Sequence, residues 1–399
     1  MKGVAIIGAG ASGCFCAANL RKLAPELPVC VFESAPKPMS KLAITGGGRC
    51  NLTNSFEGIT SLKEAYPRGE QVIKRALKSF SVEDTLEWFK RRGVPLVLQD
   101  DHCWFPASQN AMDIVRCLQK AMAGAQLRLD TPVRAIEHTA SGCLVNGESF
   151  DYVVITSGGA PKGLPFLEPL QLETVPPVPS LFTFTVPDSG LRALMGLVVP
   201  ASLSLPGTSF KADGPLLITD WGLSGPATLK LSSYAARHLA ESGYKANVAI
   251  NWLQSNEGEI REMLLETGRQ NPGKQISTTH GNLPSRLWNH LLQRTGIKAD
   301  ARWAELGSKS LNKLTASLSC DVYPMSGKSK FRDEFVTAGG VALSQINLST
   351  LESKRYTGLY FAGEVLDIDA ITGGFNLQAA WSTGYVCAQS IVKSHGSSF

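Results

Sequence analysis

Three glycine-rich segments, far apart in the sequence, have the composition to hold a phosphate-containing ligand. They read VAIIGAGASG at 4–13, DYVVITSGG at 151–159 and GLYFAGEVLDIDAITGGFNLQAAWSTG at 358–384. Glycine leaves the backbone amides uncovered and lets a ligand approach the chain closely. We therefore expect the three segments to meet around one extended cofactor.

The first segment contains the spacing GxGxxG, which is typical of dinucleotide-binding turns. Gly8 allows the tight turn, Gly10 lets a pyrophosphate approach the backbone, and Gly13 lets the next helix pack close to the strand. Ala11 and Ser12 begin that helix, whose free amides and positive dipole end face the phosphates. The spacing by itself is also compatible with a flexible turn.

The residues around this turn favour the dinucleotide interpretation. Apolar runs at 4–7 and 28–32 predict two buried parallel strands, and residues 12–24 predict the helix between them. Glu33 ends the second strand about 20 residues after the last glycine, where a carboxylate binds ribose hydroxyls. An acid here, rather than an arginine, favours a ribose without a 2′-phosphate, so both FAD and NAD fit the first segment.

The other two segments each place a glycine at the end of a predicted strand. Gly158 follows the apolar run at 152–155, and Gly363 with Glu364 follows the run at 358–362. A carboxylate in this place can accept hydrogen bonds from sugar-like hydroxyls, which in a flavin cofactor belong to the ribityl chain.

A glycine pair, Gly373 and Gly374, precedes a predicted helix at 376–392. Glycines at a helix start allow close approach of a ring, and the positive helix end suits the negative charge that a reduced flavin carries. Together with the first segment, this pair predicts FAD as the bound cofactor. The sequence has no second GxGxxG, so we expect any nicotinamide donor, NADH or NADPH, to dock only transiently near the flavin.

The loop KLAITGGGRCNLTN at 41–54 is unusual because three glycines precede Arg49, Cys50 and Asn51. Exposed amides of such a loop can cradle a phosphate or the edge of a flavin, and Arg49 adds a positive charge. The alternative is an exposed surface loop without a ligand.

Composition narrows the class of protein. The 399 residues suggest two or three domains, and the apolar content of 43% is ordinary for a globular protein. There is no apolar run of 18 or more residues, so we expect no membrane span, and the first strand leaves no room for a signal peptide. Nine cysteines without a CxxC pair indicate reduced thiols and a cytoplasmic location, and the six histidines show no metal-ligand spacing.

The order of predicted elements indicates an α/β cofactor domain interrupted by an insertion. We expect the first part of an FAD-binding domain at 1–180, a β-rich domain at 181–255, a helical domain at 256–320, and the return of the FAD-binding domain at 321–399. The proline-rich stretch at 175–180 marks the first boundary. Alternating residues at 126–150 predict a small antiparallel meander.

Four stretches of the sequence resemble the BaiN/RdsA-type (YhiN-like) FAD-dependent oxidoreductases. They are residues 41–54, GLSGPA at 222–227, TAGGV at 337–341 and the segment at 358–384. The resemblance implies a glutathione-reductase-like (Rossmann-type) FAD-binding domain with an inserted β-barrel and a small helical domain. It also implies non-covalent FAD.

The resemblance assigns cofactor-binding roles but no catalytic residue. It implies that Gly8, Gly10, Gly13 and Glu33 hold the ADP half, that Lys41, Gly48, Arg49 and Asn51 lie by the pyrophosphate or flavin, and that Glu364, Gly374, Asn376 and Leu377 lie by the ribityl chain and ring. The chain departs from the family pattern at Thr156-Ser157, where Ala-Thr is common, and at Phe375, where Tyr is common. Both changes keep the shape of the side chain.

Three functions remain open at this point. The first is an oxidoreductase that moves a hydride through flavin N5, draws electrons from NAD(P)H and reduces uridine in RNA. The second is an amine oxidase that uses O2, and the third is a non-catalytic FAD-binding scaffold. Reduction of a uracil ring needs an acid near the flavin, for which Cys50, His102 and Cys103 are candidates. Each has a plainer interpretation, as a packed thiol or an exposed loop residue.

The net charge of +5 permits a nucleic-acid partner without requiring one. The basic residues that could meet RNA phosphates are Lys63, Arg68, Lys74, Arg75, Lys78, Lys90, Arg91 and Arg92. The aromatic residues that could stack on a base are Tyr66, Trp104 and Phe105. The alternatives are a solvated helical face for the first set and core packing for the second.

Overall fold

The computed structural model describes residues 2–140, 142–160, 163–329 and 336–396. The chain forms two compact units. Unit 1 consists of Met1–Pro179 and Val336–Phe399, and unit 2 consists of Ser180–Phe335, so unit 2 is inserted within the sequence of unit 1.

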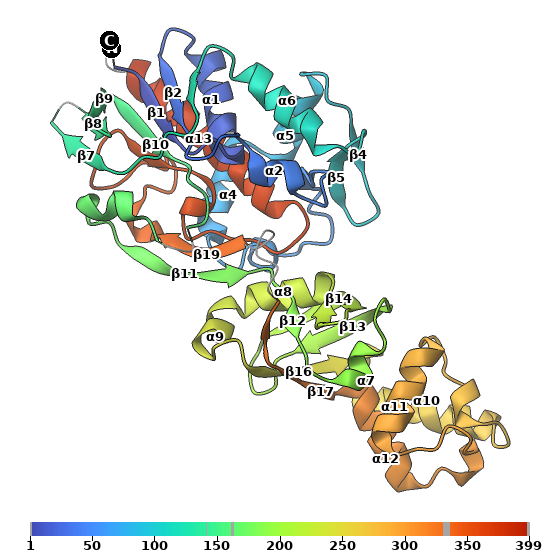
Figure 1. Cartoon of the computed structure of the whole chain (residues 1–399). Coiled ribbons are helices and arrows are strands. Elements are labelled where there is room, and N and C mark those ends of the chain that lie inside the picture. Colours follow the sequence, from blue (N-terminus) through green and yellow to red (C-terminus); the bar gives the residue numbers. More distant parts are fainter. Residues whose placement is uncertain (1, 141, 161–162, 330–335, 397–399) are drawn as a thin grey trace. The chain divides into compact units, whose positions relative to one another are not determined.

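Unit 1 is built on a parallel sheet with the strand order β20-β10-β1-β2-β6 (Figure 1). Its strands are β1 (Val4–Ile7), β2 (Val29–Phe32), β6 (Gln126–Arg128), β10 (Tyr152–Ile155) and β20 (Leu359–Phe361). Every residue of β1, β2 and β20 is buried, as expected for strands covered on both faces. The parallel order and the helical crossover from β1 to β2 confirm the predicted α/β, Rossmann-type fold.

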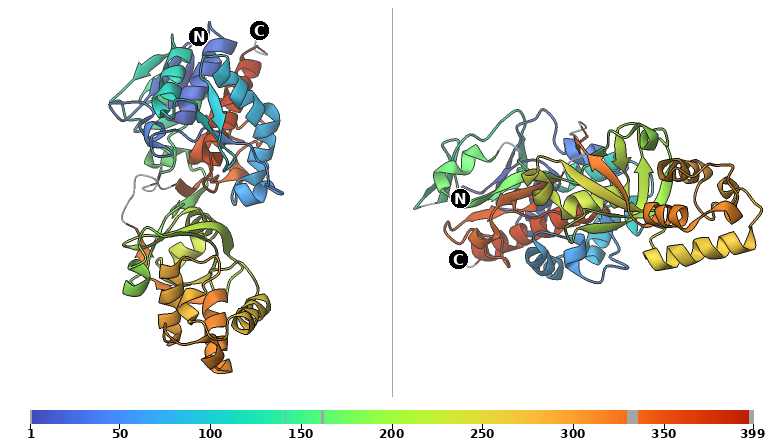
Figure 2. Two further views of the ribbon diagram at one scale, coloured as in Figure 1. Left: turned by 90° about the vertical axis from the view of Figure 1, so that its right-hand side faces the viewer. Right: turned by 90° about the horizontal axis from the view of Figure 1, so that it is seen from below.

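The helices of unit 1 include two that run along each other, α1 and α13 (Figures 1 and 2). The helices are α1 (Ala11–Leu23), α2 (Ser40–Ile44), α3 (Leu62–Ala65), α4 (Glu70–Ser79), α5 (Val82–Lys90), α6 (Ala111–Ala121) and α13 (Phe375–Gly396). The aromatic ring of Phe15 on α1 contacts the rings of Phe80, Trp88, Phe89 and Trp381. This cluster of rings fixes the first helix of the chain against the last one.

Smaller sheets complete unit 1. They are the antiparallel sheet β3 (Thr53–Asn54), β5 (Cys103–Pro106) and β4 (Leu96–Leu98), the meander β7 (Ile136–Thr139), β8 (Gly142–Val145) and β9 (Glu148–Phe150), and the pair β11 (Thr174–Ser180) with β19 (Val336–Val341). The meander predicted at 126–150 is therefore wrong in its first part, because β6 pairs in parallel with β2. Residues Gln126–Arg128 form an edge strand of the central sheet instead.

Unit 2 contains a sheet that closes on itself. Its strands are β12 (Phe184–Thr185), β13 (Val198–Ser204), β14 (Lys211–Ile218), β15 (Gly222–Ser224), β16 (Ala246–Asn251), β17 (Asp321–Met325) and β18 (Gly327–Lys328). β17 pairs with β16 at one edge, and β18 pairs with β12 at the other. Only Ser326 separates β17 from β18, so one extended segment joins both edges and makes a barrel.

The helices of unit 2 share a core with this barrel, and Figure 2 shows α10–α12 gathered at one end of it. They are α7 (Ser189–Arg192), α8 (Pro226–Tyr234), α9 (Ala236–Glu241), α10 (Glu257–Gln270), α11 (Ser285–Thr295) and α12 (Ser308–Ser319). Leu287 and Leu314 from the helices belong to the same buried cluster as Trp252 and Tyr323 from the barrel strands and their ends.

The later part of the predicted domain division differs from the structure. Residues 321–328 form barrel strands of unit 2, although the sequence suggested that the FAD-binding domain resumes at 321. An extended stretch after a helical region looks the same in either domain, and only strand pairing distinguishes them. Of the predicted return segment at 321–399, residues 330–335 and 397–399 lie outside the described part. Within the described part, no helix has both the length and the apolar content to cross a membrane.

Candidate functional site

The turn between β1 and α1 gives each glycine of GxGxxG a separate steric reason. Gly8 has a φ of +108°, and a methyl group on it would lie 2.5 Å from the Thr156 carbonyl oxygen. A methyl group on Gly13 would lie 2.0 Å from the Gly8 carbonyl oxygen. A methyl group on Gly10, in contrast, would meet no described atom within 4 Å. The fold thus requires glycine at 8 and 13, while Gly10 leaves open space for a ligand.

Helix α1 begins beside this open space without a side-chain cap in the described structure. Its N-cap residue is Gly10, and no side chain caps the helix. The Ser12 hydroxyl is buried without a hydrogen-bond partner in the described structure. Uncapped amides, a buried free hydroxyl and open space at Gly10 fit a pyrophosphate, which accepts hydrogen bonds and carries negative charge.

Glu33 lies against this turn, at the end of β2. Its carboxylate accepts hydrogen bonds from the Ala9 amide at 2.8 Å and from the Ala35 amide at 2.9 Å. These bonds hold the half-buried side chain beside the glycine turn. This is where an acid can also reach a ribose held by the same turn.

The third glycine segment returns to the start of α1. A methyl group on Gly363 would lie 3.0 Å from the Ser12 Cβ, and one on Gly384 of α13 would lie 2.7 Å from the Ser12 carbonyl oxygen. The Gly363 amide donates to the Thr383 hydroxyl at 2.9 Å. Ser12 and these two glycines, about 350 or more positions apart, therefore pack together because Gly363 and Gly384 have no side chains.

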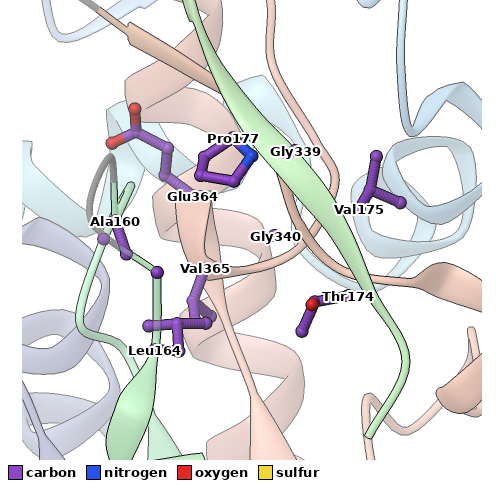
Figure 3. Close-up of a pocket in the computed structure, with 11 residues that line it drawn as sticks. Ala160, Leu164, Thr174, Val175, Pro177, Gly339, Gly340, Glu364 and Val365 are labelled. Carbon is purple, nitrogen blue, oxygen red and sulfur yellow. The ribbon is translucent and has the colours of Figure 1, made fainter.

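The second segment joins the third at a small cavity of about 40 Å³ in unit 1 (Figure 3). Gly158 and Glu364 both line it, together with Gly339 and Gly340 of β19. One oxygen of Glu364 accepts a hydrogen bond from the Thr337 amide at 2.7 Å. The convergence predicted for Gly158 and Glu364 is thus present in the structure, although the cavity itself has room only for small groups.

A second convergence joins the GGGRCN loop to the glycine pair before α13. A methyl group on Gly374 would lie 2.6 Å from the side-chain amide group of Asn51. In the orientation of this amide group that satisfies its hydrogen bonds, its oxygen accepts from the Gly374 amide at 3.3 Å and its nitrogen donates to the Thr53 carbonyl oxygen at 3.2 Å. Asn54 donates to the Gly373 carbonyl oxygen at 3.0 Å. These contacts hold together four residues, which we call the glycine wall: Asn51, Asn54, Gly373 and Gly374.

The remaining predicted residues of this region have other surroundings. Gly48 continues a left-handed turn with φ of +81°, and Arg49 is exposed, with its guanidinium 4.6 Å from the centre of the Phe105 ring. Lys41 is exposed on α2. In the described structure, no contact joins Lys41 or Arg49 to the turn at Gly10. The role of either cation toward a pyrophosphate therefore stays a prediction.

Asn376 and Leu377 lie in the first turn of α13, and their surroundings differ. The Asn376 amide group accepts from the Ala370 amide at 2.9 Å and donates to the Ala370 carbonyl oxygen at 3.0 Å. Asn376 therefore holds the loop that leads to Gly373. Leu377 is half-buried. Contact of either side chain with a flavin ring stays a prediction.

The three candidate acids are not equivalent in the structure. Burial raises the pKa of the Cys50 thiol to about 12 and, as the largest cause, that of the Cys103 thiol to about 11. Cys103 receives a weak hydrogen bond from the Asn54 amide, at 3.8 Å, so it lies behind the wall at Gly373. His102 is half-exposed, with Nδ1 3.4 Å from a Glu57 carboxylate oxygen. Both thiols stay protonated at neutral pH, which a proton donor requires.

A family model described as the HI0933-like protein Rossmann domain matches residues 2–390. The chain belongs to the HI0933-like family. A ribosomal RNA dihydrouridine synthase from Escherichia coli is 30% identical over 410 residues, covering 98% of each chain. A 3-dehydro-bile acid delta(4,6)-reductase from Clostridium scindens is 27% identical over 414 residues, covering 98% of this chain and all of that protein. As an HI0933-like protein aligned over its full length with such enzymes, the chain is an oxidoreductase with a flavoprotein fold.

Sequence reasoning did not single out several residues of the site. Thr337 and Gly159 lie against Glu364, and Asn54 holds Gly373. Each of them belongs to a distinctive run in the sequence: Thr337 begins TAGGV, Gly159 ends TSGG, and Asn54 ends NLTN. Their partners lie from 27 to more than 300 residues away, so their roles depend on the tertiary fold.

Proposed function

We propose that this protein is an FAD-dependent oxidoreductase whose substrate is uridine in RNA. The observation that carries the proposal is the start of α1, where space is open at Gly10, the buried Ser12 hydroxyl has no partner in the described structure, and Glu33 binds the Ala9 amide. When bound, FAD supplies hydride transfer through N5 of its flavin ring.

The chain's own residues would bind and orient this cofactor. The amides of α1 and the Ser12 hydroxyl would hold the pyrophosphate, and Glu33 would accept hydrogen bonds from the adenosine ribose. Glu364, which already binds the Thr337 amide through one oxygen, has a second oxygen to accept from the ribityl chain. Gly374, with Asn51 bound to its amide, would border the ring.

Uridine is the favoured substrate because relatives from Escherichia coli and Haemophilus influenzae, each 30% identical along nearly the whole chain, are named ribosomal RNA dihydrouridine synthases. NADH or NADPH is the proposed electron donor, docking transiently. An amine oxidase that uses O2 is the second candidate, and a non-catalytic scaffold is the third. Relatives named as a synthase and a reductase favour a catalytic cofactor over a purely structural one.

The proposal is tested first by the cofactor and then by anaerobic mixing. Heating the purified, reconstituted protein should release FAD, identified by chromatography, and recovery of NAD alone would contradict the proposal. NADH or NADPH should bleach the flavin, and a ribosomal RNA transcript should restore its colour without oxygen while uridine absorbance falls. If RNA leaves the reduced flavin unchanged and a small amine reduces the oxidised form, the amine oxidase replaces the RNA reductase.

A further inference from the structure

The structure separates seven of the eight basic residues between 63 and 92 into two groups, and the eighth, Lys63, is exposed on α3. Four of them interact with neighbouring protein groups, and these are Arg68 with Asp369, Lys90 over the Trp104 ring, Arg91 with Glu87, and Arg92 over the Trp88 ring. Arg68 is almost fully buried, and Arg92 also donates to the Trp88 carbonyl oxygen at 2.9 Å. Each member of the basic triplet at 90–92 thus has a partner within unit 1, while Lys90 and Arg91 remain exposed.

The second group forms one exposed face of α4. Lys74, Arg75 and Lys78 all point away from the buried side of the helix, which consists of Val72, Ile73 and Ala76. In the described structure neither Lys74 nor Lys78 lies within 4 Å of a carboxylate, and Arg75 donates only to the neutral Ser349 hydroxyl, at 3.1 Å. This face therefore carries three positive charges, none of which has a carboxylate within ion-pair distance in the described structure.

The same helix starts next to the loop that leads to the glycine wall. The Ile371 amide donates to the Ala65 carbonyl oxygen at 2.9 Å, and the Tyr66 hydroxyl donates to the Phe375 carbonyl oxygen at 2.8 Å. Arg68 pairs with Asp369 immediately before the N-cap of α4. The cationic face and the predicted ring site thus belong to one packed region of unit 1.

We propose that the α4 face of Lys74, Arg75 and Lys78 binds the phosphate backbone of the RNA substrate; this rests on the proposed function. Side chains at i and i+4 of a helix are neighbours, so Lys74 and Lys78 present two ammonium groups to one strand. A polyanion is favoured over a lipid surface because α4 exposes no large apolar side chain that could enter a membrane. Phosphate contacts position the strand without reading its sequence.

The experiment compares two matched pairs of lysines in the FAD-loaded protein. Lys74→Gln with Lys78→Gln removes the proposed contacts. Lys309→Gln with Lys313→Gln removes two exposed lysines with the same spacing on α12. Binding of fluorescein-labelled oligouridylate is followed by anisotropy as salt increases. The first pair should weaken binding of oligouridylate and oligoadenylate alike and reduce the salt slope by about 1.4, about 0.7 for each lost phosphate contact.

The control pair should change neither the affinity nor the slope. An unchanged slope in the α4 variant, an equal change in both variants, no RNA binding by the parent protein, or a preference for phosphatidylserine vesicles would each overturn the inference. FAD content and reduction by NAD(P)H are measured on the same samples. If these remain while RNA binding is absent, the α4 inference fails and the flavin oxidoreductase stands. If FAD is absent, the proposed function fails regardless of how RNA binds.

Discussion

Single residues at the β1–α1 turn show that one amino acid can be required for different reasons. Gly13 is needed by the protein itself, because the Gly8 carbonyl oxygen occupies the place of its missing side chain. Gly10 is not needed by the described protein atoms, since nothing lies near its missing side chain. A glycine that the fold does not require, at the start of an uncapped helix, points to a ligand.

This difference leads to a paired prediction. Gly10→Val should fold normally, since its φ of −80° suits any residue, yet it should lose FAD because the side chain enters the ligand space. Gly13→Ala should lower stability, because its methyl group overlaps backbone. Thermal unfolding by circular dichroism and flavin absorbance after reconstitution separate the two effects. Gly10→Val that keeps its flavin would contradict the assigned pyrophosphate site.

Glu33 gives the second prediction at this scale. Glu33→Ala should weaken FAD binding by roughly 1.5–3 kcal/mol, the range for hydrogen bonds to a charged group. Part of the loss comes from the Ala9 amide, which then lacks its acceptor. Glu33→Gln keeps one acceptor oxygen, so its affinity for FAD should lie between that of the parent protein and that of Glu33→Ala. Flavin fluorescence titration measures the affinity, and an unchanged value for Glu33→Ala would remove this residue from the site.

At the scale of elements, the loop before α13 is held by the segment that leads into α4. The ion pair between Arg68 and Asp369 is the strongest tie, with Asp369 fully buried and Arg68 11% exposed. A methyl group on Gly69 would lie 2.5 Å from the Ile368 side chain, so the two segments are in close contact. The short α3–α4 connection thereby fixes the backbone that carries Gly373 and Gly374.

Breaking this ion pair from one side should be costly. Asp369→Ala should lower the free energy of unfolding by about 3 kcal/mol, because it leaves a buried guanidinium unpaired. Arg68→Met combined with Asp369→Leu should recover much of that loss, since no buried charge remains. Urea unfolding of the single and double variants measures the difference. Additive losses in the double variant would show that the pair does not act as a unit.

At the scale of the whole molecule, the nine cysteines differ between the two units. Eight lie in unit 1 and are all buried, whereas Cys320, after α12 in unit 2, is exposed. Burial also raises the pKa of several of them, to about 12 for Cys14 and about 11 for Cys143. A buried, protonated thiol is a poor nucleophile.

A thiol reagent should therefore modify one site in the native protein. Iodoacetamide at neutral pH should label Cys320 before it modifies any of the other eight cysteines, and peptide mass spectrometry measures the labelling at each site. Cys320→Ser should remove the fast labelling, and full labelling should require denaturant. Rapid native labelling of Cys50 or Cys103 would mean that the region behind the glycine wall opens in solution.

The sequence alone was sufficient for the local patterns. The GxGxxG turn, the apolar runs of β1, β2, β10 and β20, and α1 with its following strand follow from glycine sterics and burial period, which act over a few residues. The predicted helices at 12–24 and 376–392 correspond to α1 and to most of α13. The resemblance also implied an inserted barrel, and the closed sheet of unit 2 agrees with it.

Only the tertiary structure decided which segments belong together. β6 and residues 321–328 look like independent strands in the sequence, and their sheet membership depends on distant hydrogen-bond partners. Of the basic residues at 68 and 90–92, Arg68 pairs with a buried carboxylate, and Lys90 and Arg92 lie over aromatic rings. The sequence determined which residues can bind a dinucleotide, because that chemistry is local. The fold determined which charges remain free, because neutralisation depends on neighbours far away in the chain.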